Sequence, residues 1–275
     1  MNCYATLDEL KTLLALEDAT HDASLLRLLN AASRQIEREE LTGRRFYTWE
    51  GTKYFDGHST PFWLPDDILS ITTSQLKIDE DGDGTYEATL AITDYHLYPL
   101  NDFPKIRLEI NTNGNYGGFA PGILKGIQIA GVFGYGDGLS ATPYELRTTL
   151  SADLTSSATT AQLADSSTVK IGETIRCESE QIWVKDKSGT NVTIERAVNG
   201  TTGTTHASAK AVYAYLYPED IVQATLILAM RAWKRKDSAF ADIIGTPEIG
   251  QIIMSKGVDP DVLKIVQPYR KQCYV

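Results

Sequence analysis

The chain has 275 residues, of which 42% are hydrophobic and 23% charged, with a formal net charge of −10. This composition is that of a globular protein with one large or two modest domains, and the acidic balance argues against a basic clamp that reads DNA sequence. Three widely spaced cysteines predict no disulfide framework, and no apolar run approaches the roughly 20 residues that cross a bilayer. We therefore expect folding in a reducing cytoplasm and no membrane partner.

Two helices are predicted at the N-terminus. Thr6 and Glu9 form a capping box ahead of leucines at helical spacing. Asp22 is expected to cap a second helix, whose apolar stripe runs through residues 25–36. Gly43 is expected to end this helix in a left-handed conformation.

Short strands and turns are predicted from Phe46 to Tyr135. Residues 71–78 and 86–92 flank a turn rich in Asp and Gly, which is a hairpin signal. Residues 106–110 and 126–135 indicate two further strands, and the Gly- and Asn-rich segment 111–122 indicates a loop.

The composition changes near Thr148. Residues 149–210 are rich in Thr, Ser and Ala and contain short strands separated by turns, which predicts a small all-β insert. At Pro218 the helical period returns, and a long helix ends in the basic cluster Arg231, Lys234, Arg235 and Lys236. Residues 260–266 indicate a last short helix.

Helices at both ends of the chain can pack together only if the β middle loops out between them. We therefore expect an α+β fold, in which a helical bundle from the N- and C-terminal helices carries an antiparallel β region. A small all-β domain is inserted into it. The core is expected to span residues 1–147 and 217–275, and the inserted domain residues 148–216.

The most suggestive local motif is an acidic turn. Asp79, Asp81 and Asp83, followed by Gly84, match the first half of a calcium loop, but position 12 is Leu90 where a bidentate Glu is required. The flanks also predict strands where such a loop needs helices. A solvated hairpin tip is therefore the favoured interpretation. Bound calcium or magnesium is the alternative, because three carboxylates in one turn repel one another until neutralised.

No catalytic constellation is evident. The four histidines, His21, His58, His96 and His206, lack metal-site spacing, and neither a nucleophile elbow nor a phosphate-binding loop occurs. The basic cluster near residue 235 is interpreted as a charged helix end. We expect no enzyme activity, no cofactor and no metal.

The order of motifs along the chain resembles the head–tail connector, or adaptor, proteins of tailed bacteriophages. The likeness covers residues 1–145 and 217–275, and the insert resembles a small β module of phage structural proteins, through residues 197–202 and 206–208. The motifs that carry the likeness are Tyr4–Leu10, Leu25–Ile36, Arg44–Tyr47, Tyr54–Gly57, Leu64–Asp67, Asp81–Tyr86, Tyr95–Pro99, Ile127–Tyr135, Pro218–Lys236, Gly245–Glu248, Asp259–Val262 and Pro268–Arg270.

The resemblance implies a homo-oligomeric ring, commonly of twelve copies, beneath the portal at the capsid vertex. Its C-terminal segment would dock onto the portal protein, and a β-loop would face the next neck or tail-completion ring. Genomic DNA would pass through without sequence-specific binding. The protein would assemble in the host bacterial cytoplasm and reside in the neck of the virion. The portal-docking residues map to Pro268, Tyr269, Arg270, Tyr274 and Val275.

Two other functions remain open. One is a carbohydrate-binding or adhesion module of a phage tail, using the insert and calcium at the acidic turn. The other is a hydrolase that uses carboxylic acids of the β region. Neither explains why helices at both ends bracket the β region.

Overall fold

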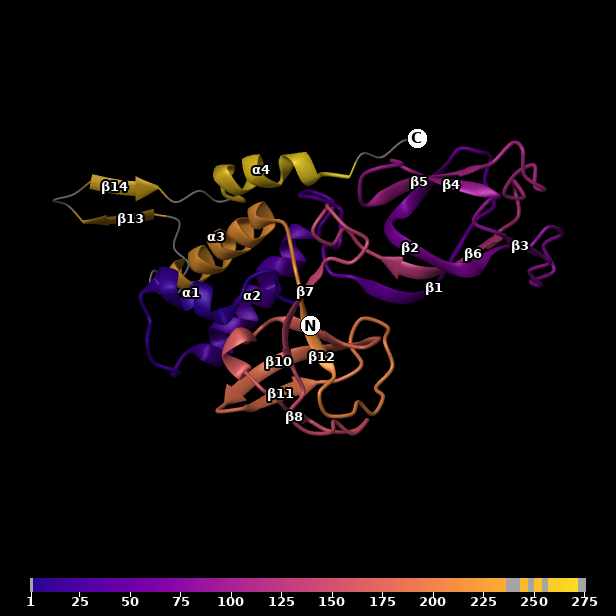
Figure 1. The fold of residues 1–275 in the computed structure, drawn as a ribbon. Coiled ribbons are helices and arrows are strands. Elements are labelled where there is room, and N and C mark those ends of the chain that lie inside the picture. The colour runs from indigo at the N-terminus through magenta and orange to yellow at the C-terminus, as the bar shows by residue number, and fades with distance from the viewer. Residues whose placement is uncertain (1, 236–242, 247–249, 254–256, 272–275) are drawn as a thin grey trace.

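The computed structural model describes residues 2–235, 243–246, 250–253 and 257–271. Figure 1 shows a group of helices and two separate β-sheets, with the N-terminus lying close to the second sheet. The helices of this part of the chain are α1 Leu7–Leu14, α2 Asp22–Ile36, α3 Glu219–Arg235 and α4 Pro260–Val266, with short 3₁₀ turns at Ser166–Thr168 and Gln267–Tyr269.

The N-terminal helices begin close to where the sequence predicts. The Thr6 hydroxyl accepts from the Glu9 amide and the Glu9 carboxylate accepts from the Thr6 amide, so the predicted capping box is confirmed. The cap predicted for α2 is wrong. His21 occupies the capping position without a side-chain bond, and Asp22 instead pairs with Lys11 at 2.7 Å. Gly43 is left-handed, with φ of 65°, but lies seven residues beyond the end of α2.

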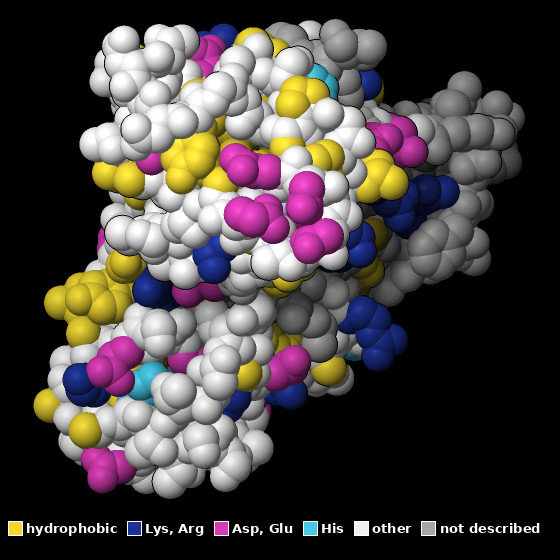
Figure 2. All heavy atoms as spheres, turned by 90° about the vertical axis from the view of Figure 1, so that its right-hand side faces the viewer, with side chains coloured by type: hydrophobic (Ala, Val, Ile, Leu, Met, Phe, Trp, Pro, Cys, Tyr) yellow, Lys and Arg dark blue, Asp and Glu magenta, His cyan; other side chains and the backbone are white. Residues whose placement is uncertain are grey.

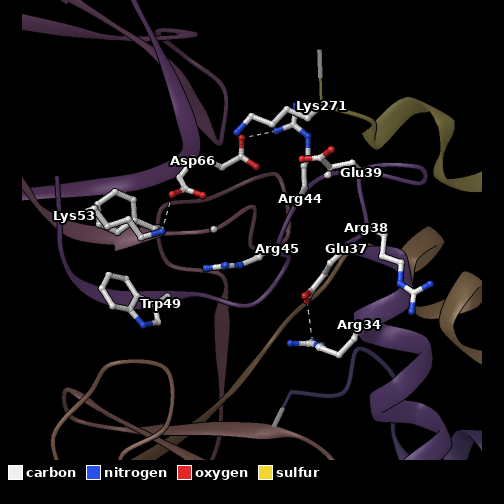
Figure 3. A pocket seen from close by; sticks show the side chains of 14 residues that line it. Arg34, Glu37, Arg38, Glu39, Arg44, Arg45, Trp49, Lys53, Asp66 and Lys271 are labelled. Atoms are coloured by element: carbon white, nitrogen blue, oxygen red, sulfur yellow. Dashed lines mark hydrogen bonds and ion pairs between the residues drawn. The ribbon is translucent and has the colours of Figure 1, made fainter. Parts of the chain in front are cut away.

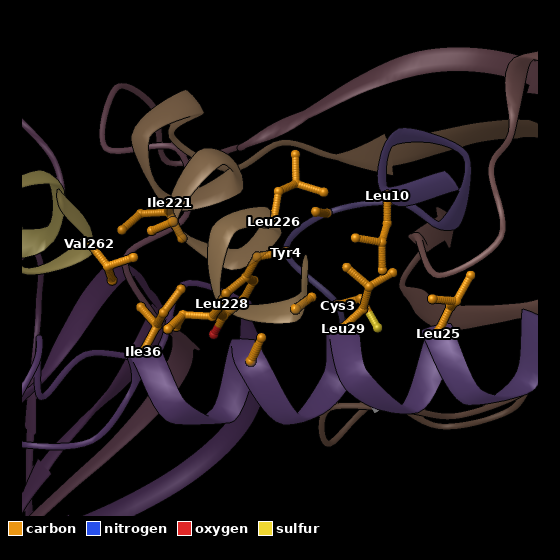
Figure 4. Close-up of a cluster of buried hydrophobic side chains, with 14 of the residues drawn as sticks. Cys3, Tyr4, Leu10, Leu25, Leu29, Ile36, Ile221, Leu226, Leu228 and Val262 are labelled. Carbon is orange, nitrogen blue, oxygen red and sulfur yellow. The ribbon is translucent and has the colours of Figure 1, made fainter. Parts of the chain in front are cut away.

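The helices share one core. Leu25, Leu29 and Ile36 of α2 are fully buried against the apolar face of α3, and Val262 brings α4 onto the same core. Tyr4 lies at its centre (Figure 4), where its ring contacts Phe46 and Tyr217 edge-on. Segments from both ends of the chain thus pack together.

The first sheet has six antiparallel strands in the order β1-β6-β2-β5-β4, with β3 paired to β2. Its long strand β2 pairs with β5 at its start, with β6 from Ile68 onward and with β3 at its end. The register shifts between Trp63 and Ile68 in the pairing with β5, and at two further places in the pairing with β6. The bounds are β1 Trp49–Phe55, β2 Phe62–Ile78, β3 Ala88–Leu90, β4 Tyr95–Tyr98, β5 Lys105–Ile110 and β6 Ile127–Phe133.

The second sheet also has six strands, in the order β7-β12-β9-β10-β11-β8, and encloses a separate apolar core. It begins at Tyr144 and ends at Tyr215, so its first strand starts four residues before the boundary expected from composition. The bounds are β7 Tyr144–Thr149, β8 Thr160–Gln162, β9 Thr174–Cys177, β10 Glu180–Ser188, β11 Asn191–Glu195 and β12 Ala211–Tyr215. A further pair, β13 Ile243–Thr246 and β14 Gly250–Ile253, forms a hairpin.

The expected fold class is therefore wrong. The molecule is mostly β, with two six-stranded sheets of comparable size, and it is not a helical bundle with a small β insert. The physical reason is that α1 and α4 have only eight and seven residues. The helices form one local layer, whereas the strands build two cores of their own. Among the described helices, none is both long and apolar enough to cross a membrane.

A polar network fixes the second sheet to the rest of the molecule. The Asn199 side chain bonds Asn2 at 2.7 Å and Gln181 at 2.8 Å, and its carbonyl accepts from the Glu50 amide at 2.9 Å. Gln181 in turn donates to Thr48 and to Glu50. Next in the chain, residue 200 is a glycine because its φ is 85° and an added Cβ would lie 2.1 Å from the Glu50 carbonyl oxygen. Several hydrogen bonds thus join the second sheet to residues 2, 48 and 50.

Replacing Asn199 with Ala is expected to lower the free energy of unfolding by about 1–3 kcal/mol, because the buried partners lose their bonds and the left-handed backbone, with φ of 57°, disfavours Ala. Urea denaturation measures the loss. Asn191→Ala, at the exposed first residue of β11, is the matched control and is expected to change little. Equal losses in the two variants would contradict this role.

A buried ionic cluster lies inside the second sheet. Glu180 is fully buried and receives two bonds from Arg196, at 2.6 and 2.5 Å. His206, also fully buried, places one ring nitrogen 2.8 Å from Glu180 and the other 2.7 Å from Glu178. Burial alone would raise the pKa of Glu180, but hydrogen bonds from Arg196, His206 and the amides of Thr204 and Ala197 hold it below its usual value.

Candidate functional site

The acidic turn lies at the far end of the first sheet, beside β3. Four carboxylates, those of Asp79, Asp81, Asp83 and Glu87, have oxygens that all lie within 4.8 Å of one another. Asp79 is buried and accepts from the amides of Gly82 and Gly84, which shapes the turn. Figure 2, which looks onto this end, shows acidic side chains gathered on that face.

Sequence reasoning identified the three aspartates but missed Glu87. Its carboxylate accepts from the Glu80 amide at 3.0 Å, across the mouth of the hairpin. In the register of the β2–β3 hairpin, residue 87 comes opposite residue 79, so the predicted pairing of 71–78 with 86–92 was the signal that could have identified it. Four clustered oxygen donors are the kind of group that calcium prefers, although exposed acidic turns are also common without one.

The C-terminal segment crosses the seam between helices and first sheet. The Tyr269 ring contacts Phe46 and Tyr135 edge-on, and its hydroxyl donates to Asp220 at 3.1 Å. Burial and the Asp220 carboxylate raise the pKa of Tyr269 to about 12. Tyr269 is therefore an internal anchor.

The other residues expected at the docking site are placed differently. Pro268 and Arg270 are exposed on either side of Tyr269. The Lys271 amide donates to the Thr42 carbonyl at 2.7 Å and ties down the end of the segment. Tyr274 and Val275 lie outside the described residues.

A groove of about 750 Å³ runs beside this segment. Its apolar side comes from the first sheet and its basic side from the C-terminal segment and the corner after α2. The residues that line it are Glu39, Thr42, Gly43, Arg44, Trp63, Leu64, Pro65, Ile106, Pro268, Arg270 and Lys271. Such a mixed surface suits a segment of another protein better than a small polar substrate.

A second hollow, of about 340 Å³, adjoins the groove and shares Arg44 and Lys271 with it (Figure 3). We refer to it as the basic hollow. Its lining comes from the end of α2, the corner that follows it, β1, β2 and β6. It comprises Arg34, Glu37, Arg38, Glu39, Gly43, Arg44, Arg45, Trp49, Lys53, Asp66, Asp67, Phe133, Gly134 and Lys271.

Among the described residues, His206 lies 3.4 Å from the Thr204 hydroxyl, but Glu180 and Glu178 hold its two ring nitrogens at 2.8 and 2.7 Å. The thiols of Cys3 and Cys177 are buried, and burial raises their pKa to about 12 and about 11, which keeps them protonated. His21 packs on Trp233, His58 packs on Phe62, and His206 belongs to the ionic cluster of the second sheet. Neither the groove nor the basic hollow is lined by a histidine, a cysteine or a serine.

Comparison with known proteins adds no relative: no family model, no curated protein and no solved structure matches this chain. Its function has to be inferred from the arrangement of its own residues.

Proposed function

We propose that this chain is a structural protein of a tailed bacteriophage, which forms the head-to-tail connector ring beneath the portal and catalyses no reaction. The observation that supports this most is a convergence in space. Segments that carry the sequence resemblance lie far apart in the chain and meet at the seam under the C-terminal segment.

Arg44 is at the centre of this convergence. Its guanidinium bonds the Asp67 carboxylate at 2.5 Å and the Tyr269 carbonyl at 2.8 Å, and it lies over the Tyr135 ring. These residues come from the corner after α2, the long strand β2, the end of β6 and the C-terminus. The resembling motifs therefore act as one unit that holds the C-terminal segment in a fixed position.

The fixed segment presents a surface that suits a protein partner. Pro268 and Arg270 are exposed beside a groove that also contains Trp63 and Ile106. Aromatic and Arg side chains around an apolar centre are typical anchors of protein interfaces. We assign this surface to the portal protein, and the net charge of −10 is compatible with DNA passing without being retained. The described part of the chain is mostly β, so the proposal includes no helical bundle.

Arg270→Glu is expected to weaken binding to the portal protein by about tenfold or more, since reversing an interface charge replaces attraction with repulsion. Binding of the full chain to its portal is measured by biolayer interferometry, and the complex is imaged by electron microscopy. The control is Lys264→Glu, an equal charge change on an exposed residue of α4. A protein that stays monomeric and never binds portal would falsify the function proposed here.

A further inference from the structure

We propose that the basic hollow binds the acidic turn of a second copy of this chain, so that copies join head to tail. This inference rests on the proposed function and deepens it by naming a contact that builds the ring. It follows from charged side chains at two separate places that form no ion pair within the described part of the chain.

The basic hollow has an excess of positive charge. Six cationic and four acidic residues line it, on a chain whose net charge is −10. Three of the cations are paired internally, because Arg34 bonds Glu37 at 2.9 Å, Arg44 bonds Asp67 at 2.5 Å and Lys53 bonds Asp66 at 2.8 Å.

Of the other three cations, Lys271 donates to the Pro65 carbonyl, and Arg38 and Arg45 carry the positive charge that is left over. Both are exposed, and neither forms an ion pair with another described residue. In Figure 3 the Arg45 side chain extends into the hollow, between Lys53 and Trp49 on one side and Glu37 on the other. A cation held in a concave, partly desolvated place is a favourable partner for a carboxylate.

The acidic turn has the opposite excess. Asp79, Glu80, Asp81, Asp83 and Glu87 supply five carboxylates, and no Lys or Arg of the described chain forms an ion pair with any of them. All except Asp79 are exposed. Their mutual repulsion is relieved when a cationic surface approaches.

The two features lie at different places on the molecule and carry opposite charge. The turn projects from the free end of the first sheet, beside β3 (Figure 1). The hollow is lined by residues from the end of α2 and from β1, β2 and β6. A contact between two such different surfaces is heterologous, and repetition of it builds a closed ring when the rotation closes. The hollow accommodates a few carboxylates. A continuous polyanion such as DNA would extend beyond the hollow along a chain whose net charge is −10, which disfavours DNA as the occupant.

Paired charge reversals test the contact. One variant carries Arg38→Glu and Arg45→Glu, the other Asp81→Lys and Asp83→Lys. For each variant alone, the affinity of self-association is expected to fall by a factor of about ten or more, since like charges then face each other. An equimolar mixture is expected to regain wild-type association, because each copy's turn again meets a hollow of opposite sign. Sedimentation velocity over about 0.05–0.5 M NaCl measures association, which should weaken as salt screens the pairs.

The matched control is Arg27→Glu with Lys264→Glu, which reverses two exposed cations away from the hollow. Circular dichroism and urea unfolding establish whether each variant is folded. If the variant with Arg38→Glu and Arg45→Glu does not fold, the milder pair Arg38→Gln and Arg45→Gln is used in its place. Wild-type rings and portal binding in both reversed variants would overturn this contact but leave the proposed function standing. Wild-type protein that forms no ring, with or without portal, would overturn the function itself. Short duplex DNA that binds the wild type but not the arginine variant, with association unchanged, would also overturn the contact.

Discussion

Replacing Glu180 with Gln is expected to destabilise the second sheet by about 3–5 kcal/mol, the largest effect of any single change in that sheet. The carboxylate is fully buried and is the shared acceptor of Arg196 and His206. Gln has the same shape but no charge, so the Arg196 guanidinium, only 9% exposed, remains buried without a counter-charge. Removing one partner of a buried pair is more harmful than never having built the pair.

Hydrogen exchange of the β9 and β10 amides measures the free energy of local opening in this sheet. The control is Glu195→Gln, which breaks the Lys185–Glu195 pair, about 40% exposed on both sides, and is expected to change stability by about 0–1 kcal/mol. If Glu180→Gln matched that control, the ionic cluster would contribute little to the stability of the sheet.

The same cluster predicts a pH dependence. Hydrogen bonds keep the pKa of Glu180 below its usual value despite burial, and bonds from His206 and Lys210 lower the pKa of Glu178. The folded state therefore holds fewer protons than the unfolded state near the ordinary Glu pKa of about 4.3. The stabilisation is complete above that pH and is lost as the pH falls through the lowered values. Between about pH 6 and pH 3 the wild type should lose more stability than Glu180→Gln.

The sequence predicts well the elements that depend on neighbouring residues. The capping box at Thr6, the helix at 260–266 and the hairpin turn at 79–84 each follow from a few adjacent side chains. The fold class does not follow from neighbouring residues, because strands such as β7 and β12 are stabilised by pairing with each other across about sixty residues. Helical periodicity at the two ends of the chain is easier to detect than short strands. The sequence therefore overestimates the share of the fold that is helical.

The same limit applies to the site. In the sequence, Asp67 and Arg44 stand out only as members of two separate motifs, Leu64–Asp67 and Arg44–Tyr47. Their pairing spans 23 residues, and the bond from Arg44 to Tyr269 spans 225. The sequence identifies Tyr269 as an aromatic residue suited to an interface. Only the folded chain shows that it packs on Phe46 and Tyr135 of the same molecule. The sequence shows Arg38 and Arg45 as two positive charges. That they line one hollow is evident only in the folded chain.

Arg44→Ala is expected to lower the free energy of unfolding by about 3–5 kcal/mol and to release the C-terminal segment. The change leaves the Asp67 carboxylate, 4% exposed, without its cation and the Tyr269 carbonyl without its donor. Urea denaturation measures the stability, and the rate of trypsin cleavage at Arg270 measures the release. Arg45→Ala is the matched control, since its exposed side chain should contribute less than about 0.5 kcal/mol to stability.

Arg44→Lys separates charge from geometry at the same position. Lysine keeps the positive charge, but it lacks the planar fork that reaches Asp67 and the Tyr269 carbonyl together while lying over the Tyr135 ring. It should therefore restore part of the stability and little of the protection from trypsin. If lysine restored both, charge alone would hold the seam.

In the double variant Arg44→Met, Asp67→Leu no charge is left buried, so stability should return towards wild type while the C-terminal segment stays released, because methionine cannot donate to the Tyr269 carbonyl.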